Sequence, residues 1–238
     1  MSKNNPKIVK KPLTTIQKRA TKRSLWVLAL FALLMSGFIA LAREVRDAET
    51  MKLDTAVLHE VHELSHAMLD APIIWLTNLG GPSVVPVITA VIVIMLFMMR
   101  RNTAALKIAL SVGGAGIINL ILKSFFGRTR PELWDRLVTE HSFSFPSGHA
   151  MASAALAASV IAVTWGTRWR YWMITLGLGY MLTIGFTRLY LGVHYPTDII
   201  AGWMVAIAWV SLINWIFSRT RKQHKAAKKG HESTSSFD

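Results

Sequence analysis

The 238-residue sequence contains no cysteine and only 13 acidic residues. Without cysteine, the protein has no disulfide framework, no thiolate nucleophile and no cysteine-ligated metal site. Any covalent catalysis must therefore use another kind of side chain. The 27 Lys and Arg residues outnumber the acidic residues and leave a formal net charge of +14 at pH 7. Such an excess is found in nucleic-acid-binding proteins, but also in membrane proteins with basic loops.

Hydrophobic residues are abundant, at 52% of the sequence, and they are gathered into long blocks. A block of roughly 17 to 25 apolar residues has the length that crosses a bilayer as a helix. The pattern predicts an all-α, polytopic membrane protein with six transmembrane helices. The predicted spans are residues 24–42, 84–99, 104–122, 149–165, 171–186 and 199–217.

The basic residues lie mainly in the two terminal segments and in two short loops between spans. These segments hold 19 of the 27 Lys and Arg residues but only two of the 13 acidic residues. The positive-inside rule places such segments in the cytoplasm. We therefore predict cytoplasmic N and C termini, a six-span domain at 24–217, and basic tails at 1–23 and 218–238, the second of them disordered. This distribution of charge does not favour nucleic acid as a partner.

The first span ends at Ala40-Leu41-Ala42, which also resembles a signal-peptidase site. A cleaved signal peptide is therefore an alternative to an uncleaved anchor. The long basic segment before the span favours the anchor. Both alternatives place the following segment outside the cytoplasm.

The segment between the first two spans carries seven acidic residues against three basic ones, as expected for an external segment. Apolar residues between Leu53 and Leu69 recur at helical spacing, which predicts an amphipathic helix on the external membrane surface. His59, His62 and His66 form a neighbouring stripe. They are interpreted as solvated surface histidines, with a metal site as the alternative, because no carboxylate completes a ligand set.

The loop before the fourth span ends in Phe145-Pro146-Ser147-Gly148-His149. Proline suits the first turn of a helix, serine is a good N-cap, and glycine lets another group approach the backbone closely. The free amides at a helix start, together with the helix dipole, favour a bound anion. This stretch therefore predicts a site for a phosphate-sized anion beside His149.

Three cations, Lys123, Arg130 and Arg188, lie at or beside the external ends of predicted spans. An unpaired cation at membrane depth costs roughly 2.5 to 3.5 kcal/mol, so an anionic partner is expected. Each cation taken singly is also compatible with snorkelling toward lipid headgroups. Their position beside a helix start with free amides favours a bound phosphate.

His194 and Asp198 lie four residues apart, on either side of Pro196, just before the sixth span. The residue before proline avoids helical geometry, and proline suits the first helical position. We therefore predict that His194 precedes the helix and that Asp198 lies in its first turn. From there the carboxylate can orient the imidazole and raise its basicity, which is how a base or nucleophile is prepared. An ordinary capping arrangement is the alternative.

Together these residues resemble the three-part signature of the type-2 phosphatidic acid phosphatase (PAP2) family of integral-membrane lipid phosphatases. The first part is Lys123, six residues and Arg130-Pro131; the second is Pro146 to His149; the third is Arg188, five residues, His194, three residues and Asp198. The resemblance covers residues 123–198 directly. Thr187 stands where the family usually has serine, but it keeps the hydroxyl group.

The resemblance implies a phosphatase that requires no metal and no cofactor. His194 would be the nucleophile that forms a phosphohistidine, and Asp198 would orient it. His149 would protonate the leaving oxygen and later assist water. The resemblance assigns the binding of the phosphate oxygens to Lys123, Arg130, Ser147, Gly148 and Arg188.

The implied substrate is a membrane lipid phosphate, bound at the external, periplasmic face of the cytoplasmic (inner) membrane. Undecaprenyl pyrophosphate is the first expectation; phosphatidylglycerophosphate, phosphatidic acid and diacylglycerol pyrophosphate are alternatives. A lipid phosphotransferase would use the same histidine nucleophile, with a second lipid in place of water. A non-enzymatic lipid-binding or transport protein is disfavoured because His149, His194 and Asp198 are all present.

Overall fold

In the computed structural model the chain forms a helical bundle, described for residues 15–234, with side-chain surroundings described from Leu25 to Arg219. This part of the chain contains eight helices and no strand, which confirms the predicted all-α class. The helices are α1 (Thr15–Arg46), α2 (Met51–His62), α3 (Ala67–Asn78), α4 (Val84–Met98), α5 (Asn102–Phe126), α6 (Gly148–Thr164), α7 (Arg170–Tyr190) and α8 (Pro196–Thr234).

Long apolar segments account for most of these helices. Within the described residues, Leu25–Arg46, Asn102–Phe126 and Pro196–Arg219 are long and apolar enough to cross a membrane. α4 and α6 are shorter apolar helices. Each predicted span overlaps α1 or one of the helices α4 to α8.

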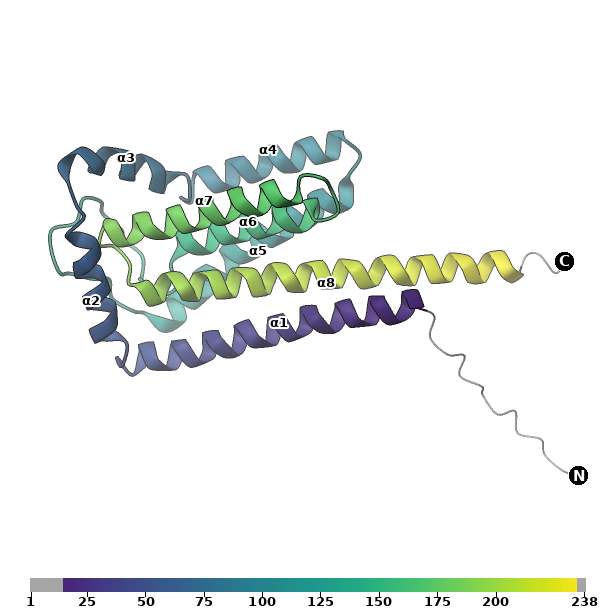
Figure 1. Ribbon diagram of the computed structural model, residues 1–238, viewed down its shortest axis with the longest axis horizontal. Coiled ribbons are helices and arrows are strands. Elements are labelled where there is room, and N and C mark those ends of the chain that lie inside the picture. The colour runs from purple at the N-terminus through teal and green to yellow at the C-terminus, as the bar shows by residue number, and fades with distance from the viewer. Residues whose placement is uncertain (1–14, 235–238) are drawn as a thin grey trace, which may run out of the picture.

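The helices that overlap the predicted spans, α1 and α4 to α8, run alongside one another, whereas α2 crosses one end of the bundle (Figure 1). α1 begins and α8 ends at the opposite end. α8 packs against α1, α5 and α6, and α6 also packs against α7. The end crossed by α2 therefore gathers the start of α8, the start of α6 and the end of α7.

α6 is rich in Ala and Ser, and Ala150, Ser153 and Ala154 are fully buried. Small residues let helix backbones approach closely in a membrane protein. The contact with α8 is so close that a Cβ atom on Gly202 would lie 2.9 Å from the carbonyl oxygen of Ser147. The start of α6 is therefore held directly against α8.

The prediction of one amphipathic helix from 53 to 69 is wrong, because α2 ends at His62 and α3 begins at Ala67. His66 is the N-cap of α3, and its Nδ1 accepts a hydrogen bond from the amide of Met68 at 3.3 Å. His62 stacks on the ring of Trp134 with 3.9 Å between ring centroids. In the described part of the chain, no group of three or more His, Cys, Asp or Glu residues is placed to hold a metal.

The predicted basic tail at 218–238 begins inside α8, and its disorder stays a prediction. α8 continues from Pro196 to Thr234. The residues after 217 are rich in Lys and Arg and contain no proline, and Lys and Arg favour a helix. The predicted N-terminal tail is also helical from Thr15 onward. Residues 1–14 and 235–238 lie outside the described residues.

Candidate active site

The residues predicted to carry chemistry meet at the end of the bundle that α2 crosses. They come from the ends of α5 and α7, from the loop at 127–147, from the start of α6, from the segment at 191–195 and from the first turn of α8. That last segment reverses direction at Gly192, whose φ of +63° favours glycine. Pro196 then begins α8, which places His194 just before the helix and Asp198 in its first turn.

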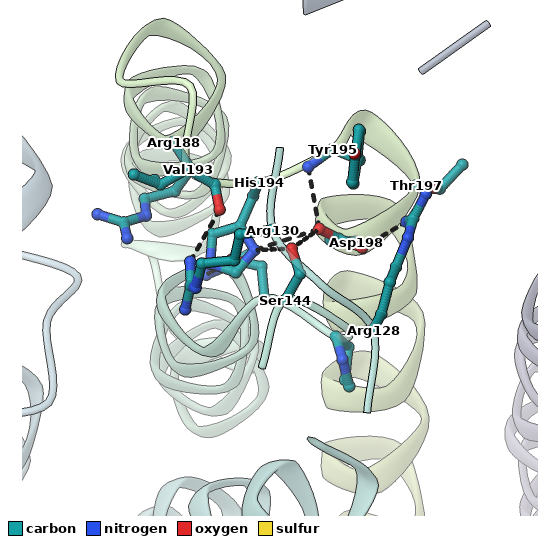
Figure 2. A network of polar contacts seen from close by, with 12 residues as sticks. Arg128, Arg130, Ser144, Arg188, Val193, His194, Tyr195, Thr197 and Asp198 are labelled. Carbon is teal, nitrogen blue, oxygen red and sulfur yellow. Dashed lines mark hydrogen bonds and ion pairs between the residues drawn. The ribbon is translucent and has the colours of Figure 1, made fainter. Parts of the chain in front are cut away.

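His194 is buried, and both of its ring nitrogens have partners (Figure 2). Nδ1 lies 3.3 Å from Asp198 Oδ2 and 3.3 Å from the Ser144 hydroxyl. Nε2 lies 3.0 Å from Arg130 Nη1. Because an ionised carboxylate only accepts and a guanidinium only donates, we infer a ring with its proton on Nδ1 and a lone pair on Nε2.

Burial lowers the pKa of His194 well below its usual range, and the nearby cations Arg130, Arg188 and Lys123 lower it further. The ring is therefore neutral near pH 7. A neutral imidazole whose orientation is fixed by a carboxylate has the state that a nucleophile or a general base requires.

Asp198 is fully buried, and both of its carboxylate oxygens have donors. Oδ2 also accepts from the Tyr195 amide at 2.9 Å and from the Ser144 hydroxyl. Oδ1 accepts from Arg128 Nη1 at 2.6 Å. The backbone carbonyl of Asp198 accepts from the Ser147 amide at 3.0 Å, which links the start of α8 to the start of α6.

Lys123 and Arg130 contact protein groups in the loop that follows α5. The Lys123 ammonium donates to the carbonyl of Phe143 and, at 3.3 Å, to the hydroxyl of Ser142. Arg130 Nε donates to the carbonyl of Ser142 at 2.7 Å. Both cations are buried and held by these protein groups.

Glu140 connects two of the predicted phosphate-binding cations. Its carboxylate accepts from Arg188 Nη2 and, at 3.5 Å, from Arg130 Nη2. Arg188 is 1% exposed and also donates to the hydroxyl of Thr77 in α3 at 3.0 Å. Burial raises the pKa of Glu140, but Arg188, Arg130 and His149 outweigh burial and hold that pKa below its usual value. An ionised carboxylate therefore lies between two arginines that could accept another anion.

α6 begins at Gly148 with Ser147 as its N-cap, and the Ser147 hydroxyl accepts from the Ala150 amide at 3.5 Å. Pro146 precedes this cap, so its predicted place in the first helical turn is wrong. The Ser147 amide is also used within the protein, which leaves fewer free amides at this helix start than the sequence predicts. A Cβ atom on Gly148 would lie 3.1 Å from Asn119 Oδ1, so glycine allows α5 to approach closely.

His149 is the second residue of α6 and lies beside the turn between α3 and α4. A Cβ atom on Gly81 in that turn would lie 3.4 Å from His149 Nε2. His149 also acts electrostatically on Glu140 and His194. The structure thus brings all the predicted site residues to one end of the bundle.

The sequence patterns do not single out Arg128, Ser144, Glu140 or Asp54. For Arg128 and Glu140 the sequence does contain a signal of a role in the site, because both are charged residues in the loop that holds two predicted phosphate ligands. Asp54 is counted in the sequence among the acids of an external segment, yet its exposed fraction is 0%. Its helical spacing with buried Leu58 is the only signal of that burial.

Residues 104–222, half of the 238-residue chain, match the family model described as the PAP2 superfamily. The chain belongs to the PAP2 superfamily. All three parts of the signature, from Lys123 to Asp198, lie within the matched residues. The resemblance seen in the sequence is therefore confirmed.

Relatives of this PAP2 protein are phosphatases of lipid phosphates. Phosphatidylglycerophosphatase B of Bacillus subtilis is 28% identical over 176 residues, which cover 71% of this chain and 86% of the relative. Undecaprenyl-diphosphatase of Sulfolobus acidocaldarius is 26% identical over 196 residues, which cover 79% of this chain and 88% of the relative.

A solved structure has the same fold. The crystal structure of a transmembrane PAP2-type phosphatidylglycerolphosphate phosphatase from Bacillus subtilis matches with a TM-score of 0.73 and 24% sequence identity, over 79% of this chain and 96% of that one. Together with the long apolar helices, this likeness shows a multi-pass membrane protein with the PAP2 phosphatase fold.

Proposed function

We propose that this PAP2 protein hydrolyses a phosphate or pyrophosphate ester of a membrane lipid through a phosphohistidine at His194. The main support is the geometry of that ring, with Asp198 on Nδ1 and Arg130 3.0 Å from Nε2. A neutral imidazole in one tautomer, with its lone pair beside guanidinium groups, is arranged to attack a phosphorus atom bound among them.

Two steps account for hydrolysis. First, His194 Nε2 forms a bond to phosphorus while the bond from phosphorus to the lipid oxygen breaks, and His149 gives its proton to that oxygen. The bound phosphate brings negative charge close to His149, which favours the protonated imidazole. Second, His149 takes a proton from water, the water oxygen attacks phosphorus, and the bond to Nε2 breaks.

The proposed phosphate ligands are the three cations and the start of α6. Phosphoryl transfer depends mainly on positioning and on stabilisation of negative charge. Arg130 and Arg188 would exchange the carboxylate of Glu140 for phosphate oxygens, and Lys123 would add a third charge. The Ser147 hydroxyl and the Gly148 amide complete the proposed site, which requires no metal or cofactor.

We further propose that the protein crosses the cytoplasmic (inner) membrane six times, through α1 and α4 to α8. The phosphatase domain is then residues 24–217, and the basic tails at 1–23 and 218–238 are cytoplasmic. In support, α1 begins and α8 ends at the end of the bundle opposite α2 (Figure 1). The site would open on the external, periplasmic face, where lipid headgroups lie.

The proposed substrate is a lipid phosphate, and undecaprenyl pyrophosphate is the first to assay. Phosphatidylglycerophosphate is the second, because relatives of comparable identity are named for each activity. Phosphatidic acid and diacylglycerol pyrophosphate complete the panel. A lipid phosphotransferase shares the first step and differs only in its acceptor.

The test uses the purified full-length protein in detergent, with excess EDTA and this lipid panel. We expect phosphate release that vanadate inhibits, and a phosphohistidine trapped from radiolabelled substrate in the wild type but not in His194→Ala. His141→Ala removes an exposed histidine of the loop before α6 and should keep wild-type turnover. Phosphate release only with an added divalent ion, or near-normal turnover of His194→Ala, would contradict the proposal. Label recovered in a second lipid would indicate the phosphotransferase instead.

A further inference from the structure

Arg128 lies two residues before Arg130 but is not among the proposed phosphate ligands. Its side chain is 9% exposed and forms ion pairs with two carboxylates from distant parts of the chain. Nη1 donates to Asp198 Oδ1 at 2.6 Å and to the Thr197 hydroxyl at 2.8 Å. Nη2 donates to Asp54 Oδ2 in α2 at 2.7 Å. Arg128 thus links α2 to the first turn of α8.

Asp54 also binds the start of α8 directly. Its Oδ1 accepts from the Thr197 amide at 3.1 Å, and its Oδ2 accepts from the Thr197 hydroxyl at 2.7 Å. The hydroxyl of Thr50, the N-cap residue just before α2, donates to Asp54 Oδ2 at 3.1 Å. The first amides of a helix have no partner within that helix, so Asp54 caps α8 from another element.

The guanidinium of Arg128 makes its contacts within the protein. Its Cζ lies 4.1 Å from the centroid of the Tyr195 ring, and both terminal nitrogens donate to carboxylates. In Figure 2, Arg128 lies on the side of Asp198 away from His194, whereas Arg188 lies on the His194 side. Arg128 therefore acts on Asp198 and not on a phosphate beside His194.

Asp54 and Asp198 are both fully buried. A buried carboxylate without a partner cation is strongly unfavourable, so the shared guanidinium fixes the two side chains together. The other groups that face Asp198 are the Ser144 hydroxyl, the His194 ring and the Tyr195 amide. With Oδ1 held by Arg128, Oδ2 remains directed at His194.

We propose that Arg128 and Asp54 are positioning residues for the nucleophile: they hold Asp198 so that its Oδ2 fixes the tautomer of His194 and Nε2 is aimed at phosphorus. This inference rests on the proposed function, in which His194 is the nucleophile. α2, which lies across the end of the bundle, thereby belongs to the framework of the active site.

The test compares Arg128→Met, Asp54→Asn and the double variant with the wild type, on a lipid phosphate that the wild type hydrolyses. The measurements are kcat and KM per folded molecule, the inhibition constant of inorganic phosphate, and Tm. For Arg128→Met we expect kcat to fall about 10²-fold, the typical effect of misplacing a reacting group by about 1 Å. The inhibition constant of phosphate should stay unchanged. Tm should fall, because two buried carboxylates lose their cation.

The double variant separates positioning from stability. Asp54→Asn removes one of the two uncompensated charges, and its amide oxygen can still accept from Thr197, so Tm should largely recover. The kcat should stay low, because Asp198 still lacks Arg128. Recovery of kcat together with Tm would show a purely structural role and overturn the inference. If Arg128→Met fails to fold, the double variant is compared with Asp54→Asn instead. Equal kcat values for those two variants would also overturn the inference.

Arg136→Met is the matched control, since Arg136 lies in the same loop and pairs with exposed Glu132 at 3.4 Å. It should keep the wild-type kcat. His194→Ala is measured in the same assay. If His194→Ala keeps its turnover, the proposed function fails and the inference with it. The positioning inference alone fails if His194→Ala is inactive and Arg128→Met keeps the wild-type kcat. It also fails alone if His194→Ala is inactive and the phosphate inhibition constant of Arg128→Met rises about tenfold.

Discussion

At the scale of single residues, the chemistry of His194 depends on what surrounds it. An unperturbed histidine has a pKa of about 6.5 and is half protonated at that pH. Burial and then Arg130 lower the pKa of His194, so its ring gains a proton only at lower pH. The nucleophile should therefore stay neutral through the range in which an exposed histidine becomes charged. The unfolded chain binds this proton first as pH falls. The contribution of His194 to the free energy of unfolding is therefore present above about pH 6.5 and is lost as pH falls below that value.

This pKa can be measured by NMR on protein with labelled histidine, with the His194 signal assigned by its absence in His194→Ala. We expect the titration midpoint of His194 to lie well below about 6.5. Arg130→Gln should move the midpoint upward, because it removes a cation 3.0 Å from Nε2. A wild-type midpoint at or above 6.5 would contradict the burial and charge described for this ring.

At the scale of elements, the contact between α6 and α8 sets the position of His149 relative to His194. A Cβ atom on Gly202 would lie 2.9 Å from the Ser147 carbonyl oxygen and 3.2 Å from the Met151 amide nitrogen. Both atoms are backbone, so one helix must shift to accommodate the methyl group. The proposed acid and the proposed nucleophile lie on opposite sides of this contact.

We expect Gly202→Ala to lower kcat about 10²-fold, because a shift of about 1 Å misaligns the reacting groups. Overpacking should also destabilise the protein by about 1 to 3 kcal/mol. Gly113→Ala in α5 is the matched control, because apart from its chain neighbours and the nearby backbone of its own helix no atom lies within 4 Å of its Cβ position. The measurements are steady-state kinetics and thermal unfolding in detergent. Equal kcat values for the two variants would contradict this account of the contact.

At the scale of the whole molecule, the absence of cysteine makes the proposed topology directly testable. Ser65→Cys introduces a single thiol at an exposed position between α2 and α3, and Thr103→Cys introduces one at an exposed position near the start of α5. We expect an impermeant thiol reagent to label Ser65→Cys in intact cells. Thr103→Cys should be labelled only after the membrane is permeabilised. The reverse pattern would place the active site in the cytoplasm.

The sequence by itself determined the helical class, the overlap of each predicted span with a helix, and the family signature from Lys123 to Asp198. These features are local: a block of apolar residues sets the length of a span, and Pro196 sets where a helix begins. The same local rules placed His194 before α8 and Asp198 in its first turn. The sequence also identified three cations that the structure brings to one end of the bundle.

Only the tertiary structure decided which distant residues meet. Asp54 follows the pattern of a solvated surface acid, and its burial depends on Arg128 and Thr197, which lie far along the chain. Glu140 likewise acquires its role from Arg188. A buried charge is stable only with a partner, and the partner is chosen by how helices pack rather than by spacing along the sequence. The link from α2 to the catalytic pair was therefore decided by tertiary packing.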